Sequence, residues 1–114
     1  MNRLIVLCKK VPDNNLCVNS IIRFSNDLSK TSKKFDGFIT TQSYWQREPG
    51  NQQFDLEYTN KLYTISNWED VVYWNKWWES EERKEVCLKH NLNIKSEVVF
   101  LNKTIDLDYL VPLL

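Results

Sequence analysis

The fold is decided by residues 62–90, which read LYTISNWEDVVYWNKWWESEERKEVCLKH. The stretch begins with the loose apolar alternation of a β-strand and continues with apolar side chains at helical spacing. Ser66 and Glu69 stand three residues apart at this change, as in a capping box, where the two side chains satisfy free backbone amides of the first helical turn. The stretch predicts a strand over 56–65 and then a helix to its end, with a bend at Ser80, where Ser-Glu-Glu resembles a second helix start.

The rest of the chain adds a strand–helix–strand segment before this stretch and one strand after it. The expected elements are a strand at 4–8, a helix at 16–30, a strand at 38–45 and a strand at 98–101. The sequence REPGN at 47–51 predicts the turn between two adjacent strands. This order predicts a ferredoxin-like βαββαβ fold of the α+β class, an antiparallel four-stranded sheet with two helices on one face. We expect one domain over residues 1–114.

The expected strands carry apolar side chains on both faces. In the second strand, simple alternation places Phe38 and Tyr44 on one side and Ile39 and Trp45 on the other. A sheet that helices cover on one face only should be polar on its open face. We therefore expect a second copy of the chain to cover that face, which gives a homodimer. The alternative is that the chain's own apolar tail, residues 109–114, folds across it.

Composition argues against nucleic acid and metal as ligands. Lys and Arg number 15, as do Asp and Glu, so no net charge attracts nucleic acid, and the cluster Lys9-Lys10 is interpreted as a solvated strand end. An RNA-recognition module shares the strand order, but it needs a Lys/Arg-Gly-aromatic run, and residues 60–66 contain no glycine. The three cysteines lack CxxC spacing and there is one histidine, so no metal site of usual spacing is expected.

The chain is expected to be cytoplasmic and not to interact with membranes. Residues 4–8 are too short for the apolar core of a signal peptide. No apolar run approaches the roughly 20 residues of a membrane-spanning helix. The cysteines, at positions 8, 17 and 87, are interpreted as free thiols, which is typical of a reducing compartment.

The helical part of the deciding stretch is unusually rich in tryptophan. At about 100° per residue, Tyr73 and Trp77 fall away from the stripe that would pack on the sheet. A buried tryptophan also requires a partner for its indole N–H. Two interpretations remain open: the rings are bulk for the core and a subunit interface, or they form the wall of a pocket for a small aromatic ligand.

A resemblance to a known family supports the second interpretation. The sequence TISNWE at 64–69, followed by Trp74 and Trp77, resembles the antibiotic-biosynthesis monooxygenase (ABM) superfamily of dimeric α/β barrels. Gly37-Phe38 matches the Gly-Phe that opens the second strand in that family, and the resemblance covers about residues 35–105. It implies a homodimer with a pocket in each subunit.

The family includes quinone-forming monooxygenases that need no cofactor and haem-degrading monooxygenases. In the resemblance, Trp77 matches a tryptophan of the haem pocket, and Asn2 loosely matches a pocket asparagine of the first strand. Cys87 stands where the haem-degrading branch has its iron-ligating histidine, and His90 lies nearly one turn later. The resemblance therefore implies no cofactor and makes haem degradation the least favoured alternative.

In the cofactor-free reaction, a deprotonated phenol or quinol reduces oxygen itself, and the protein supplies a dry pocket, a hydrogen-bond donor and a base. The candidate catalytic residues are Trp77, Tyr73 and Arg83, and the candidate ligand-binding residues are Trp74, Tyr63, Cys87, His90 and Asn2. The expected function is oxidation of a small aromatic or quinol-type metabolite. The alternative is a non-catalytic ligand-binding or interaction dimer, which the lack of a convincing acid–base pair favours.

Overall fold

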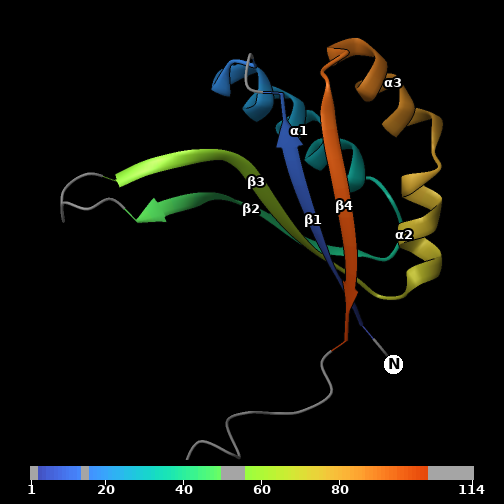
Figure 1. Ribbon diagram of the computed structural model, residues 1–114. Coiled ribbons are helices and arrows are strands. Elements are labelled where there is room, and N and C mark those ends of the chain that lie inside the picture. Colours follow the sequence, from blue (N-terminus) through green and yellow to red (C-terminus); the bar gives the residue numbers. More distant parts are fainter. Residues whose placement is uncertain (1–2, 14–15, 50–55, 103–114) are drawn as a thin grey trace, which may run out of the picture.

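The computed structural model describes residues 3–13, 16–49 and 56–102. Within these ranges the elements are β1 (Leu4–Pro12), α1 (Val18–Ser32), β2 (Phe38–Pro49), β3 (Leu56–Trp68), α2 (Val71–Trp78), α3 (Glu81–His90) and β4 (Ile94–Leu101) (Figure 1). This order confirms the βαββαβ prediction, with the second helix divided into α2 and α3. None of these described helices is long and apolar enough to cross a membrane.

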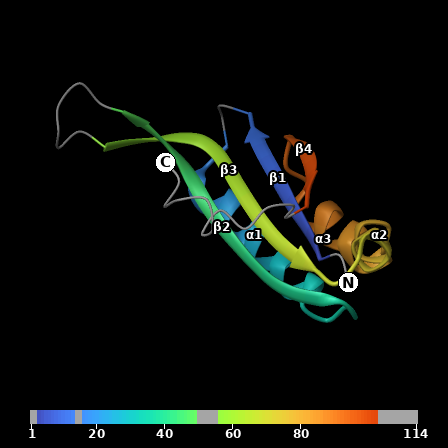
Figure 2. The same ribbon diagram turned by 90° about the horizontal axis from the view of Figure 1, so that it is seen from below.

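The strands form one sheet in the order β2-β3-β1-β4, and each neighbouring pair is antiparallel. The helices lie on one side of this sheet (Figures 1 and 2). The predicted ferredoxin-like sheet with helices on one face is therefore confirmed. The pairing of β2 with β3 extends to Pro49 and Leu56, whereas β1 pairs with β3 only as far as Leu62, so the hairpin projects beyond β1 as a two-stranded ribbon (Figure 1).

The core at one end of the sheet is built around the last residue of β3. Trp68 is completely buried, lies opposite Leu4 of β1, and meets the Phe38 ring edge-on at 5.4 Å. Its indole N–H donates to the Ser66 hydroxyl at 3.1 Å, so its polar atom is satisfied. Trp74 of α2 belongs to the same buried cluster, which joins the helix to the sheet.

The capping box predicted at Ser66 is wrong. Ser66 and Trp68 belong to β3, where Ser66 pairs across the ladder and its hydroxyl accepts from the tryptophan indole. Helix α2 instead begins after Asp70, whose carboxylate accepts from the Val72 N–H at 3.0 Å. The predicted break at Ser80 is confirmed, because its hydroxyl accepts a backbone N–H at the start of α3.

A β-bulge in β2 changes which side chains share a face. The register with β3 shifts just after Phe38, so that Ile39 is an extra residue in the strand. Phe38 therefore lies with Trp45 on the helix-covered side, where Trp45 is opposite the buried Leu62. Tyr44 lies on the open face, so the expectation that it shares a face with Phe38 is wrong. One inserted residue reverses the alternation of a strand.

Several strands are longer than predicted. β1 continues to Pro12, and β4 begins at Ile94. β2 continues through residues 47–49, so the first three positions of the expected turn belong to the strand. The last two positions of that turn, residues 50–51, lie outside the described residues. The apolar tail at 109–114 also lies outside them, as does Asn2.

The open face of the sheet carries an apolar cluster, as predicted, and polar side chains such as Lys9, Glu97 and Asn67 lie on the same face. Leu7 of β1 lies between Ile65 of β3 and Val99 of β4 on this face. Val99 is 47% exposed and Leu101 is 44% exposed, although both are aliphatic. A contiguous apolar surface of this kind is typical of an interaction site.

We expect Gly37→Ala to destabilise the fold. The backbone of Gly37 has a φ of +80°, which costs a residue with a side chain about 1–2 kcal/mol. The new Cβ atom would also lie 2.2 Å from Cγ of Tyr73. Urea unfolding should therefore show a larger loss of stability in the wild-type background than in Tyr73→Gly, which removes the Tyr73 Cβ atom as well as the ring, so that only the backbone cost remains. Equal losses in the two backgrounds would contradict this packing.

Candidate functional site

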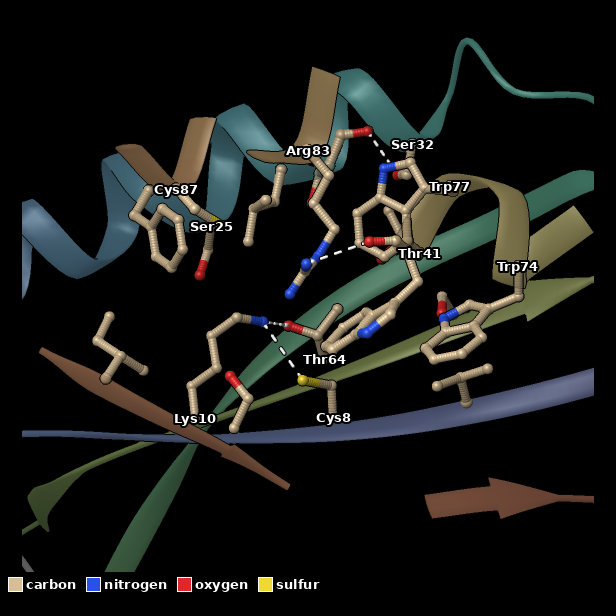
Figure 3. Close-up of a pocket in the computed structure, with 18 of the residues that line it drawn as sticks. Cys8, Lys10, Ser25, Ser32, Thr41, Thr64, Trp74, Trp77, Arg83 and Cys87 are labelled. Atoms are coloured by element: carbon tan, nitrogen blue, oxygen red, sulfur yellow. Dashed lines mark hydrogen bonds between the residues drawn. The ribbon is translucent and has the colours of Figure 1, made fainter. Parts of the chain in front are cut away.

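A cavity of about 210 Å³ lies between the helix-covered face of the sheet and the three helices (Figure 3). An apolar cavity of about 150 Å³ is sufficient for benzene, so this volume suits a guest of one or two rings. Tryptophan side chains gather in one part of the wall, and serine and threonine hydroxyls contribute much of the remainder. The wall is thus suited to a ligand with an apolar body and polar substituents.

The tryptophan wall is held by ring contacts among its members. Trp74 stacks on Trp78 with the ring centroids 5.0 Å apart, and Trp77 lies 6.0 Å from Trp68. Phe100 of β4 meets Trp74 edge-on at 4.9 Å. Such pairs are favourable beyond the area that they bury, so the wall presents flat rings in defined orientations.

Three buried polar atoms of the cavity lining lack a hydrogen-bond partner among the described residues: Nε1 of Trp77, Nε of Arg83 and Oγ of Ser25. A buried donor without a partner costs about 1–3 kcal/mol. The satisfied indole of Trp68 shows that the fold can provide a partner where a tryptophan is structural. These three atoms are the polar groups of the lining residues that the described part of the protein leaves unsatisfied.

Arg83 reaches the cavity from α3. Its guanidinium lies 3.5 Å from the centre of the Trp78 ring, and Nη1 donates to the Trp78 carbonyl at 3.2 Å. Burial lowers the pKa of Arg83 from its ordinary value, and the thiols of Cys87 and Cys8 oppose that shift. Arginine stays charged in proteins, so the cavity wall carries a positive charge held in place by an aromatic ring.

Lys10 reaches the cavity from β1 and was missed by the sequence analysis. It is 6% exposed, and its Nζ atom lies 3.5 Å from the Thr64 hydroxyl and 3.8 Å from the Cys8 thiol. Its interpretation as a solvated strand end is therefore wrong. The signal was present in the sequence, because β1 alternates with period two, and Leu4, Val6 and Cys8 place position 10 on the helix-covered face.

The structure brings together four of the eight candidate residues: Trp74, Trp77, Arg83 and Cys87 line the cavity. Asn2 lies outside the described residues. The other three candidates lie elsewhere in the fold.

Tyr73 and Tyr63 are separated from the cavity. Tyr73 packs over Gly37, where there is no room for even a Cβ atom. Tyr63 lies on the open face, since its neighbour Thr64 lines the cavity from the other side of β3, and its hydroxyl donates to Gln46 at 2.9 Å. Neither tyrosine is placed to meet a ligand in the cavity.

His90 joins two helices instead of facing a ligand. Its Nε2 atom lies 2.6 Å from a carboxylate oxygen of Asp27 on α1, and its ring packs against Phe24 at 5.4 Å. His90 is the only histidine in the sequence, so the cavity offers no imidazole to a haem iron. Among the described residues, no three His, Cys, Asp or Glu side chains are grouped to hold a metal ion. The residues present do not fit a histidine-ligated haem.

Comparison with known proteins identifies the fold. The chain resembles SnoaB, a cofactor-independent oxygenase from Streptomyces nogalater, with a TM-score of 0.73 and 10% identity over 94% of this chain and 98% of that one. The fold is that of SnoaB. An antibiotic biosynthesis monooxygenase matches with a TM-score of 0.65 and 12% identity over 90% of this chain and 99% of that one.

A dimeric ferredoxin-like protein of unknown function from Thermobifida fusca also matches, with a TM-score of 0.62 and 5% identity over 89% of this chain and 91% of that one. No family model and no curated protein matches the sequence. The expected structural resemblance to ABM proteins is therefore confirmed. At these identities the likeness establishes the fold and leaves the reaction open.

We expect the Asp27–His90 contact to make the stability of the fold depend on pH in the acid range. The hydrogen bond from His90 is the main cause that lowers the pKa of Asp27; Lys89, His90 and Lys30 add charge in the same direction, and burial opposes it. The folded pKa lies below the unfolded value near 3.9, so the stabilisation is complete above that pH and is lost as the pH falls through the folded pKa.

Between pH 6 and pH 2 the free energy of unfolding in urea should therefore fall more for wild type than for Asp27→Asn. At pH 6 Asp27→Asn should be the less stable protein. Asp36→Asn, a change at an exposed position, serves as the control and should follow wild type. Parallel pH curves for wild type and Asp27→Asn would contradict the role of this contact.

Proposed function

We propose that this protein is a cofactor-independent monooxygenase that oxidises a small aromatic or quinol-type metabolite in the cavity. The observation that supports this most strongly is the pair of buried N–H donors on Trp77 and Arg83, which have no partner among the described residues and belong to side chains that line a tryptophan-walled space (Figure 3). Donors arranged before the reaction stabilise an oxyanion more than donors in water do, because they need no reorganisation. A phenolate or enolate oxygen is the acceptor that suits them.

The reaction needs only substrate and oxygen as reactants. For a methylene group between aromatic rings, R₂CH₂ + O₂ gives R₂C=O + H₂O, so one oxygen atom enters the substrate and the other leaves as water. The substrate supplies all four electrons once it is ionised. In this proposal the protein holds the anion, keeps bulk water away and positions the ring against the tryptophan wall.

Ionisation is driven by the donors in this proposal. The described residues that line the cavity include no Asp, Glu or His to act as a conventional base. A positive charge close to a phenol lowers its pKa, as does a hydrogen bond to the charged form. Arg83 and the Trp77 N–H supply both effects, and the proton leaves to solvent.

A second candidate function is non-catalytic binding of the same kind of ligand. The observation that favours it is again the lack of a carboxylate or imidazole among the described lining residues. A binding protein needs the tryptophan wall and the donors but requires no path for oxygen. Binding without oxygen uptake would identify this function.

Oxygen uptake should be measured with a panel of quinols and anthrones. Trp77→Phe keeps a ring in the wall and removes the N–H, so we expect turnover to fall about 10- to 100-fold, somewhat less than the loss of a strong oxyanion donor. Trp45→Phe is the matched control, because Trp45 does not line the cavity, and its turnover should be unchanged. No uptake with any compound, or equal rates for the two variants, would contradict the proposal.

We also propose that the protein is a homodimer joined through the open face of the sheet. The apolar side chains around Leu7 and Val99 on that face support a protein partner, as does the T. fusca protein of the same fold, which is dimeric. The two-stranded ribbon of β2 and β3 adds a second argument, since an isolated hairpin is marginally stable in water.

Sedimentation velocity at micromolar concentration should give a dimer for wild type. Val99→Lys places a charge on the open face and should give a monomer, because the interface would bury that charge. Leu88→Lys makes the same change on α3, where Leu88 is 78% exposed, and should remain dimeric. A monomeric wild type would contradict the proposal.

A cytoplasmic location is proposed for the chain on the state of its thiols. Cys8, Cys17 and Cys87 are all free in the structure. Unpaired cysteines are typical of proteins in reducing compartments, where disulfides do not persist.

A further inference from the structure

Two cationic side chains enter the cavity from opposite walls. Arg83 reaches in from α3 and Lys10 from β1, and both point toward the same space (Figure 3). Neither takes part in an ion pair in the part of the chain that the structure describes, where the ion pairs join Lys84, Lys89 and His90 to carboxylates elsewhere. The described lining residues include no Asp or Glu. The cavity thus has two positive charges and no compensating negative charge among these residues.

Lys10 is the more unusual of the two. Lysine is almost never buried unless it is paired, and this one is 6% exposed. Its contacts are a hydroxyl at 3.5 Å and a thiol at 3.8 Å, both at the long end of hydrogen-bond distances. The ammonium group has three donors, so these contacts leave it with capacity for a stronger acceptor.

Structural reasons for a lysine at this position are weak. The side chain lies on the same face of β1 as Leu4, Val6 and Cys8, where an aliphatic residue would pack without the cost of removing a charge from water. Its neighbour Lys9 has the same charge and projects to the open face, opposite Tyr63. A positive charge on this strand can therefore be placed on the open face, without burying a lysine on the helix-covered face.

We infer that the ligand of this cavity is an organic anion with a ring-containing apolar body, and that Lys10 and Arg83 together hold its carboxylate or equivalent oxyanion. The Nζ atom of Lys10 and the free Nε–H of Arg83 supply donors from two sides, and the Ser25 hydroxyl, also without a partner among the described residues, can supply a third. The apolar body lies against the tryptophan wall. Charge-assisted hydrogen bonds of this kind are about twice as strong as neutral ones.

This inference rests on the proposed function only in taking the cavity as the ligand site, and it adds the substrate class. In a monooxygenase it specifies an aromatic acid, whose carboxylate is already ionised when it binds and is distinct from the group that reacts. It requires no step of oxygen chemistry, so binding measurements test it directly.

Isothermal titration calorimetry should compare benzoate, 2-naphthoate and 4-biphenylcarboxylate with their neutral primary amides. We expect at least one carboxylate to bind at least 10-fold more tightly than its amide. Lys10→Met keeps an unbranched chain and removes the charge, and it should weaken binding of that carboxylate at least 10-fold without changing the affinity of the amide. Lys9→Met is the matched control on the open face and should bind the carboxylate as wild type does.

Stability measurements separate loss of the site from loss of the fold. Lys10→Met should be at least as stable as wild type to urea, because it removes a buried charge that has no carboxylate partner within residues 3–13, 16–49 and 56–102. The inference is overturned if all three carboxylates fail to bind at millimolar concentration, if the amides bind as tightly, if Lys10→Met and Lys9→Met bind alike, or if Lys10→Met is less stable than wild type.

The oxygenase proposal can fail separately. A protein that binds a carboxylate through Lys10 and consumes no oxygen retains this inference and loses the proposed reaction. A protein that oxidises neutral quinols at the same rate with Lys10→Met retains the reaction and loses this inference.

Discussion

The complete burial of Trp68 at the end of β3 is the constraint on which the rest of the structure depends. Its ring lies between β1, β2 and α2, and its indole N–H must find an acceptor inside the strand, which Ser66 provides. This arrangement keeps the chain in β3 for two residues beyond Ser66 and delays the start of α2. As a result Trp74 and Trp77 face the sheet, and the cavity has its aromatic wall.

The fold was largely predictable because its signals are local. Periodicity and turn residues indicated the element order, and Ser80 marked the second helix start correctly. The errors have a common physical cause, which is that tertiary contacts overrode a local pattern. Ser66 could have capped a helix but serves a buried indole, and the extra residue at Ile39 reverses an alternation that the sequence alone cannot show to be interrupted.

The candidate site was predictable only in part. The family resemblance indicated Trp77, and the spacing of α2 and α3 brought Arg83 to the same wall. Tyr63 and His90 carry suitable chemical groups. The alternation along β3 places Tyr63 on the open face, and His90 contacts Asp27 of α1. Lys10 was missed because a charge near the end of a short predicted strand is normally solvated, and the strand in fact continues past it.

The cavity combines features that favour a ligand at the expense of a simpler core. Filling the space with aliphatic side chains would remove the cost of a void and of three buried polar atoms that find no partner in the described part of the chain. Natural proteins depart from the most stable arrangement chiefly at functional sites. Because the two charges without an ion pair among the described residues lie beside the same tryptophan wall, one ligand that carries an oxyanion on an aromatic body would compensate the charges and cover the wall.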